Sequence, residues 1–437
     1  MIRDIDLYLG NMSNEFKRVD WAASTNIYEV NLRQYTYEGS FNAFKKELPR
    51  LSDMGVETLW FMPITPIGIA NRKGTLGSYY SASDYVSTNK EFGTLEDFKE
   101  LVKAAHALGQ KVIVDWVANH TSWDHVWTKT HPEFYSRNHE GNFRPPFPDW
   151  EDVIHLNFDN TALWDAMIDA MAFWVRECDI DGFRCDMAHL VRLSFWHDAR
   201  KRLDAIKPLF WLAECEELDY HNVFDATYTW KWMHTSQEYC RHKISIRELY
   251  ATLTEYHNEF PKDAIRTYFT SNHDENSWNG SEYEKYHDAV KVLGVFSCTW
   301  NGVPMLYSGQ ELPNKKRLKF FDKDPIEWKA NCELHNFYKT LLHLHKNNPA
   351  VAGGDIKVAT IKLHTNQDNK VFAFIRKKGN KELLVLLNLS AELVLQLMVH
   401  EAIVDGTFIN VFTNGQVHLD NHSTYNLDSW GWLVFEK

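Results

Sequence analysis

The chain contains few cysteines, and none of them are spaced so that they could pair locally. Six occur among 437 residues, with no Cys-x-x-Cys motif. Disulfide-stapled secreted domains depend on clustered cysteines. Because the cysteines are scattered, we expect reduced, mostly buried thiols, as in a reducing compartment.

The sequence also lacks an excess of positive charge, a long apolar run and a signal peptide. The formal net charge is −12, which argues against nucleic acid and anionic membrane surfaces as partners. No stretch approaches the ~20 apolar residues of a membrane span. The N-terminus has no basic start, apolar segment and small-residue cleavage site. We expect a cytoplasmic protein; a secreted protein whose leader has been trimmed is the alternative.

The chain does have length and many aromatic side chains. A chain of 437 residues fits one large barrel or sandwich with a smaller module. Hydrophobic residues make up 44% of it and aromatic residues 14%, with 17 Trp and 19 Tyr. Most aromatic rings fill cores, but so many also suit a ligand with flat apolar faces, such as a sugar.

Short apolar strands alternate with amphipathic helices over residues 1–350. Such alternation is typical of a parallel sheet covered on both faces, and eight strands predict a (β/α)8 TIM barrel. Thr94 and Asp97 have the spacing of a helix capping box. The strands are expected at 25–32, 57–63, 111–116, 180–186, 209–214, 223–227, 265–270 and 303–307, and the helices near 41–55, 94–109, 161–177, 194–205, 246–259, 285–300 and 332–346.

Two connections are long, and the pattern changes after residue 350. Residues 63–92 follow the second strand and residues 117–160 the third; loops of that length in a compact domain are usually functional. Over residues 351–437 the apolar period becomes two, around turns at Gly379-Asn380 and Asn414-Gly415. This predicts a small antiparallel β domain, which we interpret as a β-sandwich.

Polar side chains stand where several predicted strands end. In a TIM barrel the active site lies at the C-terminal ends of the strands. Side chains alternate along a strand, so Arg184 and Asp186 share one face and Cys185 points outward. The strand-end residues are Asp115, Asn119 and His120 after strand three, Arg184 and Asp186 at strand four, Glu214 at strand five, and His273 and Asp274 after strand seven.

Two carboxyl groups that flank a glycosidic bond are the usual machinery of glycoside hydrolysis. One attacks the anomeric carbon, and the other donates a proton to the leaving oxygen. We interpret Asp186 as the nucleophile, because Arg184 beside it would lower its pKa and hold it ionised. Glu214 follows the apolar residues 211–213, which suits a protonated acid.

Four segments resemble the signature regions of the α-amylase family, glycoside hydrolase family 13: "DWVANH" (115–120), "DGFRCDMAH" (181–189), "WLAECE" (211–216) and "YFTSNHDEN" (268–276). The segments "GVETLWFMPI" (55–64) and "GVPMLYSGQE" (302–311) resemble its second and eighth strands. The resemblance covers nearly the whole chain. It implies that residues 117–160 are a short domain-B insertion.

The resemblance also implies roles for single residues. Asp186 corresponds to the nucleophile, Glu214 to the general acid/base and Asp274 to the carboxylate that stabilises the transition state. The implied substrate-binding residues are Tyr80, His120, Arg184, His189 and His273. Either Tyr79 or Tyr80 could be the tyrosine whose ring stacks on the sugar. For His189, a structural role is the alternative to substrate binding.

A calcium ligand is implied at Asn119, but His155 stands where the family carries a second, aspartate ligand. Hard cations prefer oxygen ligands. We therefore expect no required cofactor. A calcium site completed by backbone carbonyls stays open.

The leading hypothesis is a retaining hydrolase of α-1,4-glucans such as starch, maltodextrin or malto-oligosaccharides, with carboxyl groups about 5–5.5 Å apart. An α-glucosidase or an α-glucan transglycosidase would use the same acids. An inactive carbohydrate-binding or interaction protein is the distant alternative. A metal-dependent barrel hydrolase is set aside, because the first strand carries no histidine. Chain-length preference, endo or exo action, bond selectivity and oligomeric state stay open.

Overall fold

The computed structural model describes residues 16–401, 403–420 and 422–437, so most of the N-terminal segment considered above for a leader lies outside the described residues. Eight parallel strands close into a barrel in the spatial order β1-β10-β9-β8-β7-β6-β3-β2. Each strand therefore neighbours the next one in sequence, which confirms the TIM barrel. The strands are β1 (Ile27–Val30), β2 (Thr58–Phe61), β3 (Lys111–Trp116), β6 (Gly182–Cys185), β7 (Phe210–Ala213), β8 (Ala226–Tyr228), β9 (Ile265–Tyr268) and β10 (Val303–Tyr307).

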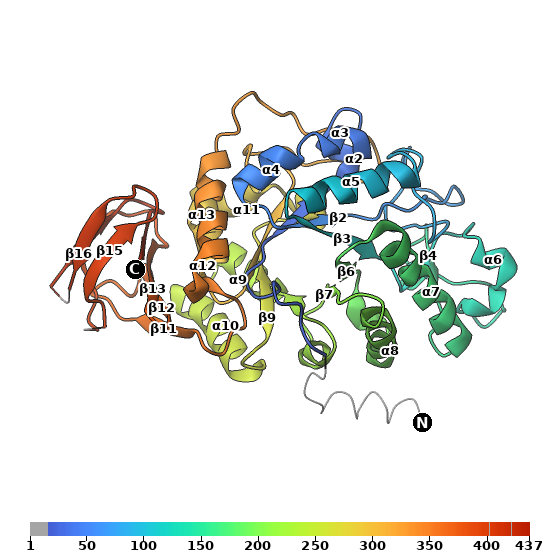
Figure 1. Ribbon diagram of the computed structural model, residues 1–437. Coiled ribbons are helices and arrows are strands. Elements are labelled where there is room, and N and C mark those ends of the chain that lie inside the picture. The colour runs from blue at the N-terminus through green and yellow to red at the C-terminus, as the bar shows by residue number, and fades with distance from the viewer. Residues whose placement is uncertain (1–15, 402, 421) are drawn as a thin grey trace.

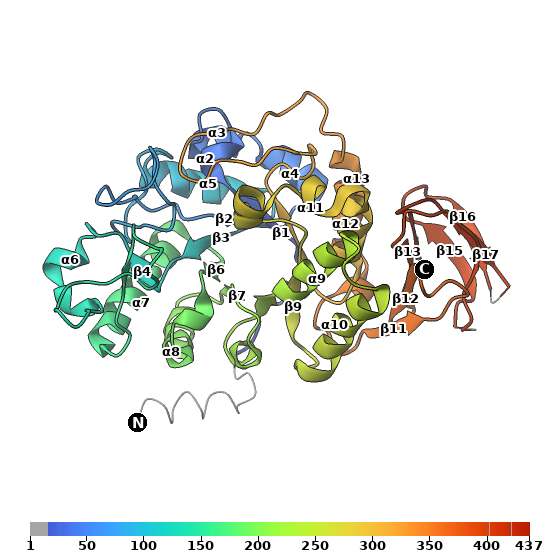
Figure 2. The same cartoon turned by 180° about the vertical axis from the view of Figure 1, so that it is seen from behind.

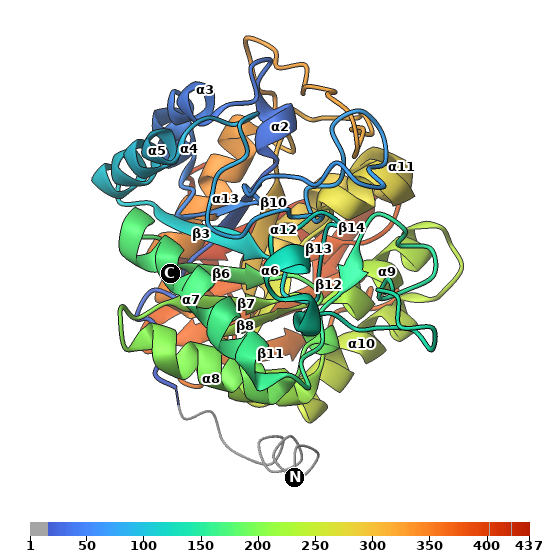
Figure 3. The same ribbon diagram turned by 90° about the vertical axis from the view of Figure 1, so that its right-hand side faces the viewer.

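Helices surround the barrel, as Figure 3 shows for α5, α7, α8 and α10. The predicted capping box of α5 is present: the Thr94 side chain accepts from the backbone of Asp97, and the Asp97 side chain accepts from the backbone of Thr94. The helices are α2 (Leu32–Tyr35), α3 (Phe41–Lys45), α4 (Leu48–Met54), α5 (Leu95–Ala107), α7 (Thr161–Cys178), α8 (Leu193–Asp204), α9 (Trp230–Cys240), α10 (Ile246–Glu259), α11 (Glu282–Tyr286), α12 (Val290–Thr299) and α13 (His335–Asn347).

Several elements differ from the prediction. The helix expected at 41–55 is split into α3 and α4, and α4 starts anew after Glu47 with Pro49 in its first turn. The helix expected at 285–300 is split into α11 and α12, because His287 has a positive φ of 52° and interrupts the helical backbone. The strand expected at 223–227 begins at Ala226, after a short 3-10 turn at Leu218–Asn222. Helix α9 was not predicted, because its apolar residues are not confined to one face.

Side chains alternate between the inside and the outside of the barrel. Ile27, Ile113 and Ile265 belong to the cluster inside the barrel. Cys185 belongs to the larger cluster between the strands and the helices. Arg184, its neighbour in β6, is 0% exposed and faces the interior side. The predicted orientation of this charged pair is confirmed.

The connection after β3 carries its own small elements. They are the paired strands β4 (His120–Thr121) and β5 (Ile154–His155), helix α6 (Trp127–Thr130) and a 3-10 turn at Pro132–Phe134. Figures 1 and 2 show this segment at the opposite end of the molecule from the C-terminal strands.

The last strands form antiparallel sheets, as predicted. A six-stranded sheet has the order β11-β12-β13-β18-β15-β16, and β14 pairs with β17. Both predicted hairpins are present, β12 with β13 and β15 with β16. Side chains of the two sheets share one apolar cluster. The strands are β11 (Ala359–Leu363), β12 (Val371–Lys378), β13 (Lys381–Asn388), β14 (Val394–Met398), β15 (Gly406–Asn410), β16 (Gln416–Leu419), β17 (Thr424–Leu427) and β18 (Trp432–Glu436).

Arg376 of β12 joins this sheet to the barrel. Its side chain is 0% exposed and donates to the backbone carbonyls of Trp300, Val351 and Ala352.

All six cysteines are free, and five of them are buried. Within the described ranges, no helix has both the length and the apolar character needed to cross a membrane.

Candidate active site

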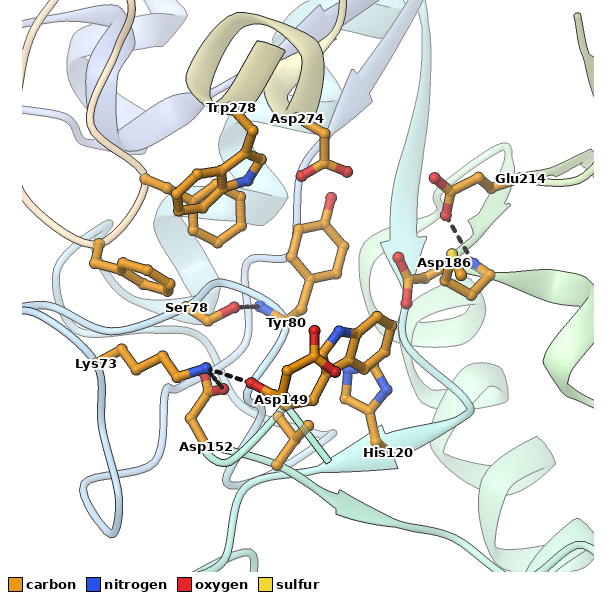
Figure 4. Close-up of a pocket in the computed structure, with 15 residues that line it drawn as sticks. Lys73, Ser78, Tyr80, His120, Asp149, Asp152, Asp186, Glu214, Asp274 and Trp278 are labelled. Atoms are coloured by element: carbon orange, nitrogen blue, oxygen red, sulfur yellow. Dashed lines mark hydrogen bonds and ion pairs between the residues drawn. The ribbon is translucent and has the colours of Figure 1, made fainter. Parts of the chain in front are cut away.

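A cavity of about 470 Å³ lies at the C-terminal ends of the barrel strands (Figure 4). The three predicted carboxylates line it together: Asp186 directly after β6, Glu214 directly after β7, and Asp274 in the loop after β9. Tyr80 and His120 line it too, as predicted. The remaining lining residues are Lys73, Ser78, Asp149, Trp150, Asp152, Val153, Met187, Trp278, Phe320 and Phe321.

Arg184 lies behind these carboxylates and does not line the cavity. Its Nη1 is 3.0 Å from both Asp115 and Asp186, and its Nη2 is 2.9 Å from Glu214. Nη1 donates a hydrogen bond to Asp186, whereas the Nη2 N–H groups do not point at Glu214 well enough to form a hydrogen bond. One buried guanidinium therefore contacts three carboxyl groups, and it makes aligned hydrogen bonds to Asp115 and Asp186 but not to Glu214.

Burial raises the pKa of Asp186 and Glu214, each to about 7, and the pKa of Asp115 to about 6. Arg184 lowers all three, as predicted for Asp186, but burial and the neighbouring carboxylates outweigh it. Arg184 therefore acts on the pKa of Asp186 in the predicted direction, but it does not keep the net pKa low, because burial is the larger cause. The net pKa of both Asp186 and Glu214 therefore lies above the ordinary value of a carboxyl group, so either group can carry a proton more readily than an exposed carboxyl group can.

The backbone after β6 brings the two acids together. The Asp186 N–H donates to the carbonyl of Trp116, and the Met187 N–H donates to Glu214 Oε2 at 2.8 Å. Met187 has a positive φ of 40°, which a non-glycine residue rarely adopts. Strained backbone of this kind clusters at functional sites.

Asp274 and Glu29 hold a buried histidine between them. His273 Nδ1 is 2.6 Å from Glu29 Oε1, and its Nε2 is 3.3 Å from Asp274 Oδ2. Burial lowers the pKa of His273, but the two carboxylates outweigh it and raise that pKa well above its usual value. Burial raises the pKa of Asp274, but His273, Arg184 and Trp278 together outweigh it, so the net pKa of Asp274 lies below its ordinary value. Asp274 is therefore a stable anion, and its side chain is 41% exposed in the cavity.

Tyr80, rather than Tyr79, is the tyrosine of the cavity. Its hydroxyl donates to Asp115 at 3.1 Å and lies 2.8 Å from Nε2 of His273. Tyr79 instead donates to Asn31, away from the cavity. The sequence left these two rings as alternatives, and tertiary contacts separate them.

The predicted histidines occupy different places. His120 lines the cavity, and burial, together with His155, lowers the pKa of His120 to about 3. His273 lies behind the lining side chains. His189 is exposed and lines a second cavity of about 390 Å³, which shares Met187 and Glu214 with the first. The second cavity therefore continues past Glu214.

Several lining residues come from loops and were not predicted. Lys73 of the loop after β2 lies 3.3 Å from Asp152 and donates to the carbonyl of Asp149, so it bridges two loops across the cavity wall. Besides Tyr80, four further aromatic side chains line the cavity: Trp150, Trp278, Phe320 and Phe321. Their positions depend on loop folding, which no sequence period reports. Glu29 was also missed, although a carboxylate within an apolar strand is a sequence signal of a buried functional residue.

The residues around Asn119 do not fit a hard cation. The Asn119 amide donates to His120 Nδ1 at 3.2 Å, and His155 Nδ1 lies 2.8 Å from Ser136 Oγ. Burial lowers the pKa of His155 to about 4, so this ring is a neutral nitrogen ligand at most. In the described part of the chain, no group of three or more His, Cys, Asp or Glu side chains could hold a metal ion.

A TIM barrel with three acids at the C-terminal mouth and an aromatic cavity defines the class of the glycoside hydrolases. The family model for the alpha amylase catalytic domain matches residues 13–151 and 147–332. The chain belongs to the alpha-amylase family, and the predicted resemblance is confirmed.

Curated relatives carry amylase and transferase names. The alpha-amylase MalA of Haloarcula japonica is 27% identical over an alignment of 398 residues, which covers 85% of this chain and 56% of the relative. The maltogenic alpha-amylase of Bacillus acidopullulyticus is 23% identical over 512 residues, covering 100% of this chain and 82% of the relative. The chain spans only 56% and 66% of the length of two such relatives.

Solved structures match along nearly their whole length. A noncanonic maltogenic alpha-amylase, AmyB from Thermotoga neapolitana, has a TM-score of 0.86 at 31% identity and covers 95% of this chain and 98% of that chain. An alpha-amylase from Lactobacillus plantarum has a TM-score of 0.86 at 28% identity, with 95% and 99% covered.

Proposed function

We propose that this protein hydrolyses α-1,4-glucosidic bonds in malto-oligosaccharides and starch with retention of configuration. The observation that carries the proposal is the contact of Arg184 with both Asp186 and Glu214 at the floor of a cavity that Asp274 also lines. Two carboxyl groups beside one guanidinium, both with a raised pKa, can supply one nucleophile and one acid. The names of the relatives support an α-glucan as the substrate class.

The proton belongs on Glu214. Asp186 accepts a hydrogen bond from Arg184, which favours its charged form. Glu214 accepts a hydrogen bond from the Met187 N–H but no aligned one from the Arg184 guanidinium, so we place the proton on Glu214. In the first step a carboxylate oxygen of Asp186 forms a bond to the anomeric carbon, the glycosidic C–O bond breaks, and the Glu214 proton passes to the leaving oxygen. In the second step Glu214 takes a proton from water, whose oxygen displaces Asp186.

Asp274 supplies charge stabilisation. Its carboxylate is held anionic by His273 and is exposed to the cavity, where it would accept hydrogen bonds from sugar hydroxyls. An anion here also favours the positive charge that develops on the sugar ring in the transition state. The neighbouring rings of Tyr80, Trp278 and Phe320 offer flat apolar faces to the sugar.

One observation favours the release of short products. The leaving part of the substrate must lie on the Glu214 side, where the second cavity continues. Figure 4 shows Lys73, Asp149 and Asp152 on the other side of Asp186 from Glu214. The Lys73 bridge would therefore limit the length of the part that becomes attached to Asp186. We infer exo-like action that releases short malto-oligosaccharides. Transfer of the sugar from Asp186 to a second sugar instead of water would use the same covalent intermediate.

The test is a timed product profile with maltoheptaose and soluble starch, read by chromatography and by proton NMR of the first-formed anomer. Short malto-oligosaccharides in the α form would support the proposal, and the β form would refute retention. Asp186→Asn is the control, since it keeps the shape and removes the nucleophile. Products longer than the substrate would assign a transglycosidase, and glucose alone an α-glucosidase. Sugar binding without turnover would assign a binding protein.

Location and cofactor use belong to the same proposal. We propose a cytoplasmic enzyme, because none of the six cysteines forms a disulfide and five of them are buried. We also propose that it requires no calcium, because histidine nitrogen atoms of His120 and His155 lie near Asn119 where a hard cation would need oxygen ligands.

A further inference from the structure

A separate cavity of about 240 Å³ lies between the barrel and the C-terminal sheet. Its walls come from helix α10, from the end of α12 and from strands β11 and β12, and it shares no residue with the two active-site cavities. Arg266 reaches it from the second position of β9, whereas Asp274 lies beyond the other end of that strand. The lining residues are Tyr250, Leu253, Thr254, His257, Arg266, Trp300, Asn301, Thr360, Lys362 and Phe372.

The lining contains basic groups and no carboxylate. Arg266, Lys362 and His257 contribute to it, whereas no aspartate or glutamate does. This contrasts with the chain as a whole, which has 59 acidic against 47 Lys and Arg residues. A surface that concentrates positive charge against the net charge of its protein favours an anionic ligand.

Arg266 is a buried cation without a compensating anion. It is 6% exposed, and in the described ranges no carboxylate lies within the 4.0 Å that defines an ion pair. Its Nη1 donates to the carbonyl of Tyr256 at 3.2 Å, whereas its Nε has no hydrogen-bond partner. A buried charge of this kind is costly, and an unsatisfied donor of a native structure is commonly completed by an ion or a ligand.

Aromatic rings form the rest of the wall. Tyr250 and Phe372 have ring centroids 4.9 Å apart, and Trp300 lies 5.3 Å from Phe372. The Lys362 ammonium lies 4.2 Å from the centre of the Tyr250 ring, so this cation is already held beside the cavity. Such rings suit the apolar face of a sugar, and the guanidinium suits the oxygen atoms of a phosphate.

We propose that this cavity binds a phosphorylated monosaccharide, with the phosphate on Arg266 and Lys362 and the sugar ring against Trp300. The volume is below the ~300–1,000 Å³ of sites for drug-sized ligands, so one sugar ring with one phosphate is the appropriate size. The site is independent of the proposed hydrolysis, because no catalytic residue lines it.

The experiment is isothermal titration of the full chain with glucose 6-phosphate, inorganic phosphate and glucose, each at constant ionic strength. We expect glucose 6-phosphate to bind most tightly, inorganic phosphate more weakly, and glucose not detectably. Arg266→Met should weaken glucose 6-phosphate binding about tenfold or more, because it removes charge-assisted hydrogen bonds. Lys362→Met should weaken it several-fold.

Lys381→Met is the matched control, because Lys381 is an exposed lysine of the same sheet that does not line the cavity. Its binding should equal that of the unchanged protein. If circular dichroism shows that Arg266→Met does not fold, the binding of glucose 6-phosphate to Lys362→Met, a variant at an exposed position, tests the site instead. No binding of either phosphate compound at millimolar concentration, or equal binding in the variants, would overturn the site. Equal affinity for inorganic phosphate would overturn the assignment of the sugar ring.

Discussion

Replacing Arg184 with methionine removes the cation from the floor of the active-site cavity while keeping an unbranched side chain. Arg184 is 0% exposed and makes ion pairs with Asp115, Asp186 and Glu214 at 2.9–3.0 Å. Without it, all three carboxyl groups lose the neighbour that favours their charged forms. We therefore expect the pKa of each to rise.

The size of the effect follows from the pKa of the nucleophile. A cation at this distance lowers a carboxyl pKa by ~1–3. With Arg184 present the pKa of Asp186 is about 7, so in the variant we expect about 8–10. On the acidic limb of the pH profile, a rise of ~1–3 in the pKa of Asp186 lowers its ionised fraction at a given pH, and with it kcat/KM, by about 10- to 1,000-fold.

The assay is hydrolysis of a chromogenic maltoside over a wide pH range. The acidic limb of kcat/KM reports the pKa of the free enzyme's essential base. We expect this limb to move to higher pH by about 1 or more in Arg184→Met and to stay near its original place in Arg184→Lys. A lower rate with an unmoved acidic limb, in a variant whose circular dichroism is unchanged, would refute this account of Arg184.

Further predictions follow from single contacts. Lys73→Ala removes the bridge to Asp152 and should lengthen the products from maltoheptaose by chromatography; unchanged lengths would contradict a limiting wall. Glu29→Gln removes a carboxylate 2.6 Å from His273, so the pKa of His273 should fall and kcat should drop about tenfold. Burial lowers the pKa of His125 to about 3, so the protein loses stability as the pH falls below about 6.5, where the unfolded histidine takes up a proton. Between pH 7 and pH 5, the free energy of unfolding measured with urea should therefore fall by about 2 kcal/mol less in His125→Phe than in the unchanged protein. A chelator should leave Tm unchanged, and a rise of Tm with added calcium would contradict the absence of a calcium site.

The order and type of most barrel elements could be predicted from local pattern. The capping box at Thr94 and the apolar period of the strands act within a few residues, so the sequence contains all of their causes. Helix α9 and the break at His287 were missed, because packing and a positive φ override the local pattern there. Element boundaries are decided by such tertiary contacts.

The carboxylates of the candidate site were predictable for a different reason. Asp186 and Glu214 directly follow barrel strands, and parallel strands bring all their C-terminal ends to one mouth. Alternation along β6 then placed Arg184 and Asp186 on the same face. The raised net pKa of Asp186 could not be predicted from the sequence, because its burial and the nearness of Asp115 depend on the closed barrel.

The sequence by itself determined the barrel, the family and the strand-end acids, because these depend on period and on short motifs. Only the tertiary structure decided which side chains meet across long separations. Glu29 contacts His273 from a position 244 residues away, and Lys73 reaches Asp152 from another loop. Loop conformation has no period in the sequence, and the charge balance around Arg184 depends on how deeply three carboxylates from separate strands are buried together.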